Sequence, residues 1–444
     1  MREAGETTST GAEPGRRLTF PAAVVLVVSS MVGTGIFTTT GLLVRDLGSP
    51  VAVLAAWLLG GVLALCGALS YGELAAALPR NGGEYQLLSR IYHPAVGFAA
   101  GLVSLVVGFS APLAASALAF GHYLSAVFPG TPPAAAGMAL VAVAAVPHAV
   151  NVRLGGRVLV SVTALEVALL AVFVAAGAAR GEPARLLAGG GRTAAAALGP
   201  AFAMALVYVS FAYSGWNGAV YLAGEVRDPS RTVPRALLAG TGGVVALYLA
   251  LNVVFLAAAP AGELAGVVEV GHVAAVRLLG RDGGRALSAL VALVLASSVS
   301  AMLMAGPRVY ERMGLDYPPL AILARRTRHG GPAVAVALQA ALALAMIATS
   351  SFAALLTYVG FTLSLVAGLT VAGVLVLRRR EPGLARPVRT WGYPVTPLLF
   401  LVLSAWMVAV ALVANPVSSW AGVATGAAGL LLHAALGRRA RRAT

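Results

Sequence analysis

The segment from Ser29 to Phe37 places two glycines, Gly33 and Gly35, among hydroxyl side chains in the middle of an apolar stretch that runs from Phe20 to Val44. Glycine weakens a helix interior by about 1 kcal/mol relative to alanine. In a membrane, a broken helix is tolerated only where its freed N–H and C=O groups are buried in protein or line a cavity. The segment therefore predicts a helix break that offers backbone groups to a polar ligand.

A second segment, from Phe211 to Gly218, repeats this pattern around Ser214 and Gly215. Five predicted spans separate the two breaks, so the two halves of the chain would insert with opposite topology. Paired interruptions in corresponding helices indicate a transporter binding site at the interface of two repeats. The alternative is that the glycines only allow helices to pack closely, which is common in membranes.

The composition indicates a membrane protein. Of the 444 residues, 59% are hydrophobic and only 11% are charged, whereas a soluble protein is about 25% charged. The chain has a net charge of +15, and its charged residues lie mostly between long apolar stretches. This arrangement indicates a membrane protein and argues against a nucleic-acid partner. Arg378 to Arg380 are expected to anchor the chain to anionic lipid headgroups.

Twelve apolar stretches reach or approach the length of about 20 residues that a transmembrane helix needs. They are residues 20–44, 51–78, 95–127, 133–150, 157–179, 199–224, 234–258, 285–306, 332–349, 352–377, 396–414 and 417–436. With the N-terminus inside, 24 of the 31 basic residues lie in inner segments. This bias predicts a multi-pass protein of the inner (cytoplasmic) membrane with both termini in the cytoplasm.

The predicted organisation is two repeats of five helices followed by two more. It comprises a cytoplasmic tail (1–18), a first repeat (19–180), a second repeat (198–378), two additional transmembrane helices (379–436) and a second tail (437–444).

Several motifs resemble one known family. Ser30 to Phe37 resembles the first-helix signature of the amino acid–polyamine–organocation (APC) superfamily, and Ser70 to Tyr85 resembles its second helix and first inner loop. Phe211 to Ala236 is similar to the L-type amino acid transporter branch and its bacterial relatives. The resemblance covers nearly the whole chain. It implies the leucine-transporter fold, an all-α membrane protein with a five-plus-five inverted repeat and two extra C-terminal helices.

An amino acid zwitterion suits both breaks. Its carboxylate would fit free amides at the start of a half-helix, and its ammonium would fit free carbonyls at the end of one. Neither break holds a charged side chain, which favours a neutral L-amino acid. The predicted substrate-binding residues are Ser30, Met31, Gly33, Thr34, Gly35, Phe211, Ser214 and Trp216. By the resemblance, Phe211 is the gating aromatic, whereas Trp216 either lines the pocket or only packs.

Glu166 is a carboxylate in the middle of the fifth span. Many members of the family that the chain resembles have a lysine at this position, where the ammonium takes the place of sodium in sodium-coupled relatives. An ionisable group inside a membrane is a functional hypothesis by default. We expect Glu166 to couple transport to protons or to gate it, near Ser297, Ser298 and Ser300. A sodium role for these serines, and a purely structural Glu166, stay open.

The predicted function is secondary active transport of a neutral L-amino acid by alternating access, either proton-coupled or by exchange. The alternatives are an amine or polyamine transporter and a non-transporting amino acid sensor. No cofactor or metal is expected, and no enzyme activity, because the sequence shows no nucleophile–base pair, metal cluster or phosphate-binding loop. Eukaryotic members of the L-type branch pair with a glycoprotein through a cysteine in the loop after the third span. The loop at 128–133 has no cysteine, so we expect no disulfide-linked partner. Six charged residues near the predicted cytoplasmic side are candidates for an inner gate of ion pairs, the alternative being a solvated loop face: Glu73, Arg80, Glu84, Glu225, Arg227 and Arg231.

Overall fold

The chain folds into helices. The computed structural model describes residues 18–150, 156–187, 199–328 and 330–442, and these ranges contain no β-strand. The predicted all-α fold is confirmed. The first half consists of α1 (Phe20–Met31), α2 (Thr34–Leu47), α3 (Pro50–Ala77), α4 (Gly83–Ile91), α5 (Pro94–Val103), the π-helical turn η1 (Ser104–Ser110), α6 (Ala111–Val127), α7 (Pro133–Val150), α8 (Gly156–Arg180) and η2 (Pro183–Leu187).

The second half has a similar order of elements. It consists of α9 (Pro200–Ala212), α10 (Gly218–Tyr221), η4 (Ala223–Glu225), α11 (Pro229–Ala258), α12 (Ala261–Leu264), α13 (Val270–Asp316), η5 (Pro318–Ala324), α14 (Ala333–Thr349), α15 (Phe352–Arg380), α16 (Val395–Ala414) and α17 (Pro416–Arg442). Every predicted span coincides with a helix or a group of consecutive helices. In the described residues, eight helices are long and apolar enough to cross a membrane, and α1 with α2 forms a ninth span. The count of twelve stays a prediction.

Local sequence explains where many helices begin and end. Proline occupies the start of α3. A backbone N–H at that position would have no acceptor within the helix, so proline, which lacks one, costs no hydrogen bond there. The Ser49 hydroxyl accepts a hydrogen bond from the Ala52 amide and caps the same helix. Gly48 ends α2 with a φ of 62°, a left-handed conformation that glycine adopts without strain. The turn at residues 48–50 is therefore a C-cap followed directly by an N-cap.

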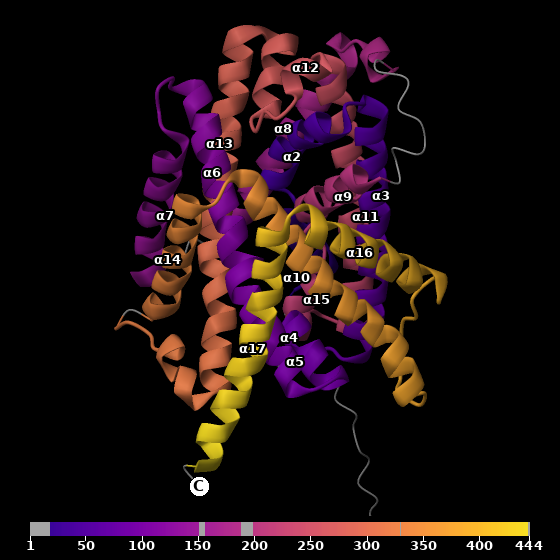
Figure 1. Cartoon of the computed structure of the whole chain (residues 1–444), viewed down its shortest axis with the longest axis vertical. Coiled ribbons are helices and arrows are strands. Elements are labelled where there is room, and N and C mark those ends of the chain that lie inside the picture. The colour runs from indigo at the N-terminus through magenta and orange to yellow at the C-terminus, as the bar shows by residue number, and fades with distance from the viewer. Residues whose placement is uncertain (1–17, 151–155, 188–198, 329, 443–444) are drawn as a thin grey trace, which may run out of the picture.

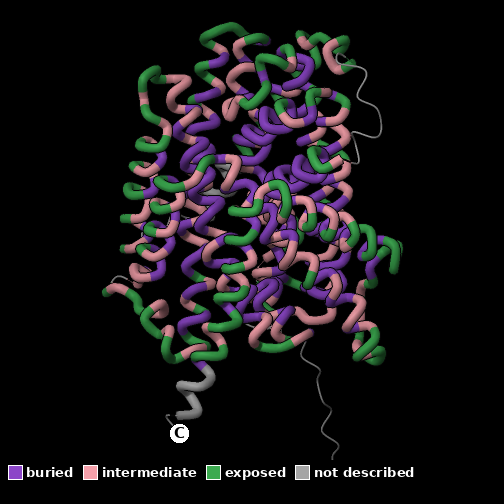
Figure 2. The backbone as a smooth tube through the Cα atoms, viewed as in Figure 1, coloured by how far each residue is buried: buried purple, intermediate pink, exposed green. Residues whose placement is uncertain are grey.

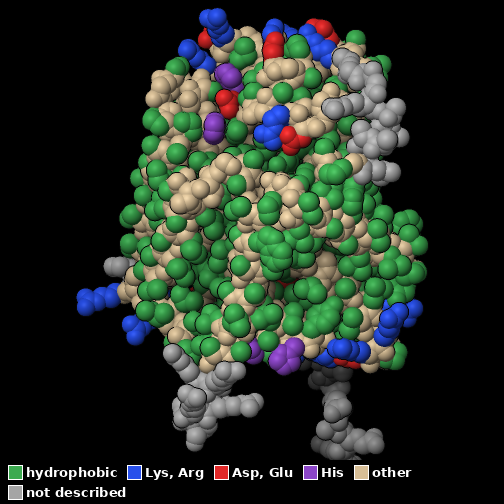
Figure 3. Space-filling view, viewed as in Figure 1, with side chains coloured by type: hydrophobic (Ala, Val, Ile, Leu, Met, Phe, Trp, Pro, Cys, Tyr) green, Lys and Arg blue, Asp and Glu red, His purple; other side chains and the backbone are tan. Residues whose placement is uncertain are grey.

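The two broken helices lie at the centre of the bundle. α2 packs against α9, and α1 packs against α10 and α11. In Figure 1, α7 and α14 lie on one side of these segments and α16 on the other. Buried backbone is concentrated in the middle, with exposed backbone around it (Figure 2). Apolar side chains dominate the middle of the visible surface, and charged side chains gather at its two ends (Figure 3). This distribution fits a protein that crosses a membrane.

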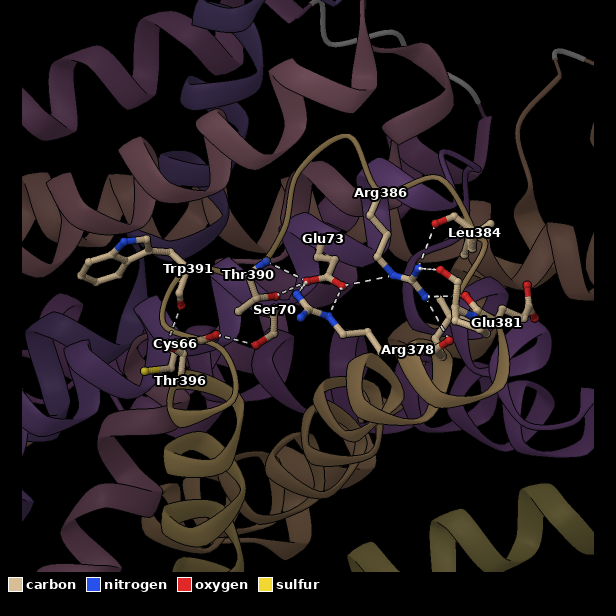
Figure 4. Close-up of polar contacts among 12 residues, drawn as sticks. Cys66, Ser70, Glu73, Arg378, Glu381, Leu384, Arg386, Thr390, Trp391 and Thr396 are labelled. Atoms are coloured by element: carbon tan, nitrogen blue, oxygen red, sulfur yellow. Dashed lines mark hydrogen bonds and ion pairs between the residues drawn. The ribbon is translucent and has the colours of Figure 1, made fainter.

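One buried carboxylate ties the first half of the chain to the segment before the last two helices. Glu73 of α3 accepts hydrogen bonds from Arg378 at 2.8 and 2.6 Å and from the amide and hydroxyl of Thr390, both at 2.7 Å. The Nε atom of Arg386 lies 3.5 Å from Oε1 of Glu73. Figure 4 shows how these groups converge on Glu73. The network fixes the connection between α15 and α16 against α3.

Arg378 also stacks on an aromatic ring. Its guanidinium lies 3.7 Å from the centre of the Tyr393 ring, and its side chain is 20% exposed. The predicted lipid anchor is therefore wrong for Arg378, because its charge is taken up by Glu73 and Tyr393. Glu73 belongs to this structural network, and its partners in the described residues come from the C-terminal part of the chain.

A glycine is required where α2 meets α9. A Cβ atom on Gly35 would lie 2.6 Å from the Ala212 Cβ and still closer to the Ala212 Cα. We expect Gly35→Ala to lower the free energy of unfolding by about 1–3 kcal/mol, as overpacking does elsewhere. The measurement is the apparent Tm of the purified protein in detergent. Gly243→Ala is the control, because no heavy atom lies within 4 Å of its added Cβ. Equal Tm values for the two variants would contradict the close approach.

Removing the Glu73 charge should destabilise the protein. Glu73→Gln leaves Arg378 and Arg386 beside a neutral amide, and breaking a buried ion pair from one side costs about 3–5 kcal/mol. We expect a clear drop in the apparent Tm and loss of the interaction between α3 and the segment around Thr390. Glu381→Gln is the matched control, because Glu381 pairs with Arg90 at an exposed position where such pairs contribute little. A control that is as unstable as Glu73→Gln would argue against the network.

Candidate substrate site at two broken helices

The first break lies between α1 and α2. α1 ends at Met31, α2 begins at Thr34, and their axes differ by 40°. Val32 is extended, with φ −73° and ψ 117°, and its amide donates to the Val28 carbonyl at 2.8 Å. The amides of Gly33, Thr34 and Gly35 precede the first hydrogen bond of α2, so the helix itself gives them no acceptor. The predicted break is confirmed at the predicted residues.

The second break follows α9. α9 ends at Ala212, a turn occupies residues 213–217, and α10 begins at Gly218. Gly215 has a φ of 95°, which strongly favours glycine. Within the turn, the Ser214 amide donates to the Phe211 carbonyl at 3.0 Å. The carbonyl of Phe211 therefore already accepts one hydrogen bond within the turn.

The two breaks contact each other. A Cβ on Gly215 would overlap the Ser30 carbonyl oxygen, and one on Gly218 would lie 2.7 Å from the Ser30 hydroxyl oxygen. Together with the contact of Gly35 and Ala212, these glycines let the two interrupted backbones approach closely. Ser30 remains exposed within this contact, so accessible surface persists at the break. The structure therefore brings Ser30, Gly35 and the turn around Gly215 together, as the paired pattern predicted.

Tyr248 of α11 belongs to the first break, although the sequence analysis missed it. Its hydroxyl donates to the Met31 carbonyl at 2.7 Å and lies beside the Gly33 amide. Its ring stacks on Tyr213, with centroids 5.2 Å apart, and meets Trp57 edge-on. A tyrosine in an apolar span has no local signal that would reveal this contact, because its partner lies 217 residues away in the chain.

Thr34 contributes to the site through its backbone. Its hydroxyl is hydrogen-bonded to the Ser116 hydroxyl of α6, and its carbonyl accepts from Thr38 at 2.8 Å. Further along α2, Thr40 donates to the Asn252 side chain at 2.5 Å. The polar side chains of α2 are thus used to hold this half-helix in place.

The two aromatic candidates differ in environment. Phe211 is buried near the end of α9, next to the break. The Trp216 ring lies edge-on to Tyr71, with centroids 4.7 Å apart, and packs against Gly67 and Phe400. Of the two interpretations of Trp216, the structure supports packing between α3 and α16.

Glu166 is buried in α8 with one carboxylate oxygen that lacks a hydrogen-bond partner in the described residues. It lines a small apolar cavity between α8, α2 and α13, together with Phe37, Leu169, Leu170, Leu287, Leu290, Val291 and Val294. A buried polar atom without a partner is energetically costly and is rare in folded proteins. The position is therefore a candidate for a group that changes its partner or its charge during function.

In the described residues, no hydrogen bond joins Glu166 to the three candidate serines of α13. Ser298 faces the first break, with its hydroxyl oxygen 3.8 Å from where a Cβ of Gly33 would lie. The Ser300 hydroxyl pairs with the His148 ring of α7 at 2.8 Å. Ser297 is half-buried next to Ser298. The structure thus connects Ser298 to the break, and it leaves Glu166 facing an apolar cavity.

Charged groups around α12 and the start of α13 form a separate set of contacts. Glu269 lies 3.5 Å from the His122 ring, and Arg277 pairs with Glu263. Burial raises the pKa of Glu269, but hydrogen bonding and the positive charges of His122 and His272 outweigh it, so the pKa lies below its ordinary value. These pairs hold the segment around α12 in place and leave the breaks free of side-chain charge.

The chain is similar to known membrane transporters over almost its whole length. Residues 18–429 match the family model described as amino acid permease. The chain is 27% identical to the serine/threonine exchanger SteT of Bacillus subtilis, over 94% of this chain and 96% of the relative. It is 28% identical to the large neutral amino acids transporter small subunit 2 of Rattus norvegicus (87% and 75%) and to the Asc-type amino acid transporter 1 of Mus musculus (90% and 77%). The expected resemblance is confirmed, and the chain belongs to the amino acid permease family of the APC superfamily.

Proposed function

We propose that this protein exchanges neutral L-amino acids across a membrane by alternating access. The observation that carries the proposal is the contact of two broken helices whose freed backbone groups meet at segments that hold no charged residue of their own. Such a site can recognise the part that all amino acids share, namely one carboxylate and one ammonium. It offers no partner to a charged substrate side chain.

In the proposed binding mode, the substrate carboxylate accepts from the amides of Gly33, Thr34 and Gly35. The positive end of the α2 dipole favours a negative charge there. The ammonium donates to the carbonyls of Ser30 and Met31, and to those of the second break. Tyr248 now donates to Met31, so it would share or yield this carbonyl when an ammonium binds. Phe211 is proposed to cover the bound substrate.

Exchange is favoured over the other modes by the relatives. The serine/threonine exchanger and the large neutral amino acids transporters are named for neutral substrates, and the first is named for exchange. An amine or polyamine transporter would be expected to carry acidic side chains at the breaks, whereas Glu166 faces an apolar cavity. A non-transporting sensor on the same fold is the remaining alternative.

The proposed setting is the cytoplasmic membrane with both termini inside. The bias of basic residues toward the predicted inner segments supports this orientation. The similar order of elements in the two halves supports the five-plus-five repeat, with α16 and α17 as the two additional helices. We propose that lipid surrounds the apolar middle of the molecule, and that no partner is linked through the buried Cys66.

Uptake into proteoliposomes tests the function. Vesicles preloaded with unlabelled neutral L-amino acids should take up labelled L-threonine and L-leucine, whereas empty vesicles should take up little of either. Exchange should continue when the proton gradient is collapsed. Uptake into empty vesicles that requires the gradient would instead indicate a proton symporter. The absence of uptake in both would favour amines as substrates or a sensor.

We propose that Glu166 gates or couples the transport step by changing its charge. Glu166→Gln keeps the size of the side chain but cannot exchange a proton. We expect the exchange rate of the wild type to vary with pH, and the variant to lose that dependence. Glu182→Gln is the control, because Glu182 is an exposed carboxylate that follows the same helix and pairs with Arg185. A variant that transports like the wild type at every pH would make Glu166 a structural residue.

A further inference from the structure

Glu84 is a buried carboxylate that is held by neutral groups. It is the second residue of α4 and is 5% exposed. Its first oxygen accepts hydrogen bonds from the Tyr71 hydroxyl at 3.1 Å and from the Asn217 amide at 2.5 Å. Its second oxygen accepts from the Tyr221 hydroxyl. Among the ion pairs that the described residues form, none involves Glu84, so it does not belong to the predicted gate of ion pairs.

The donors explain how a carboxylate can be buried there. The side-chain nitrogen of Asn217 can only donate, and the three donors satisfy both oxygens of the carboxyl group. Glu84 also lies in the first turn of α4, where the helix dipole favours a negative charge. Loss of these donors would leave a desolvated anion, which is unfavourable. The arrangement is therefore stable only while α3, α4 and α10 stay together.

The segment just before α4, residues 81–82, is also hydrogen-bonded to the second broken helix. The Gly82 amide donates to the Tyr221 carbonyl at 3.1 Å, and the Gly224 amide donates to the Asn81 side chain at 2.7 Å. Gly83 lies flat against the Tyr221 ring, where a Cβ would come within 2.5 Å of a ring carbon. These contacts lie toward the end of the molecule at which α17 finishes and α4 and α5 lie, here called the terminal face (Figure 1).

A third contact involves the start of α1. The Leu18 amide donates to the Glu225 carbonyl at 3.0 Å, and the Arg227 amide donates to the Leu18 carbonyl at 2.9 Å. The first broken helix is thereby joined to the segment that follows the second. Near the terminal face, the two broken helices are thus held by backbone bonds and by Glu84.

We propose that Glu84 is a positioning residue that latches the terminal face closed and links this closure to the substrate site. Asn217 is the last residue of the second break, so a shift of that break on substrate binding moves a donor of Glu84 directly. The proposal rests on the proposed exchange and adds a reason for it. The empty protein opens slowly toward the terminal face, because opening strips the donors from a buried carboxylate.

Net efflux compared with exchange measures the latch. Proteoliposomes loaded with labelled L-threonine are diluted into buffer with or without unlabelled L-threonine. Loss of buried hydrogen bonds worth about 1–3 kcal/mol corresponds to a rate change of at least about fivefold, so Glu84→Ala should raise the ratio of net efflux to exchange by that factor or more. Glu84→Gln should stay closer to the wild type, because its amide offers one acceptor and a donor to a tyrosine hydroxyl.

Glu381→Ala is the matched control. Glu381 pairs with Arg90 of the same helix α4, but the pair is exposed and joins α4 to the end of α15. Its ratio of net efflux to exchange should equal that of the wild type. An unchanged ratio in Glu84→Ala would overturn the latch and leave the proposed exchange intact. A wild type without exchange would overturn the proposed function, and the latch is then judged by a second measurement.

The second measurement is the accessibility of the second break. In a Cys66→Ser background, Ser214→Cys is labelled with a membrane-impermeant maleimide applied at the terminal face. Glu84→Ala should speed labelling by at least about fivefold, on the same energetic estimate. Where Glu84→Ala does not fold, Tyr221→Phe removes one donor and should give a smaller increase in the same direction. An unchanged labelling rate in the folded variant overturns the proposal.

Discussion

The structure depends on the close approach of two interrupted helices in an apolar medium. Unpaired backbone groups are unfavourable there unless they are buried in protein or line a polar site. Gly35, Gly215 and Gly218 remove the side chains that would keep the two breaks apart. The surrounding helices then serve mainly to keep the two breaks in contact with each other.

Three buried carboxylates are accommodated in three different ways. Glu73 is surrounded by two arginines and a threonine, Glu84 by neutral donors, and Glu166 has an oxygen without any partner in the described residues. A buried carboxylate that is paired with cations is hard to pull away from them, because removing either partner leaves an uncompensated buried charge. One held by neutral donors can lose them one at a time, and one with an unpartnered oxygen is the least stabilised of the three. The first position is suited to a fixed joint, the second to the proposed latch, and the third to the proposed coupling role.

Much of this arrangement is predictable from the sequence, because glycine, hydroxyl residues and apolar length carry local signals. Both breaks, the helix ends at Gly48 and Pro50 and the all-α fold follow from such signals. Contacts between distant residues do not. The hydroxyl of Tyr248 on Met31 and the three donors of Glu84 depend on how helices far apart in the chain pack. Glu73 does form ion pairs, with Arg378 and Arg386, whereas the expected ion pair was wrong for Glu84. Charge and position alone do not reveal whether a carboxylate contacts an arginine or a tyrosine.

The first broken helix is held unequally on its two sides. α2 is pinned by hydroxyl contacts to Ser116 and Asn252 and by the Tyr123 hydroxyl on the Phe37 carbonyl at 2.8 Å. α1 is joined at its start by two backbone hydrogen bonds and at its end by Tyr248. Hydrogen bonds to other elements therefore lie along α2 but only at the ends of α1, which is otherwise held by packing against α10 and α11. Packed apolar surfaces slide more easily than hydrogen bonds break, so we expect any movement of the first span to be carried by α1 and to bend the backbone at Val32 and Gly33.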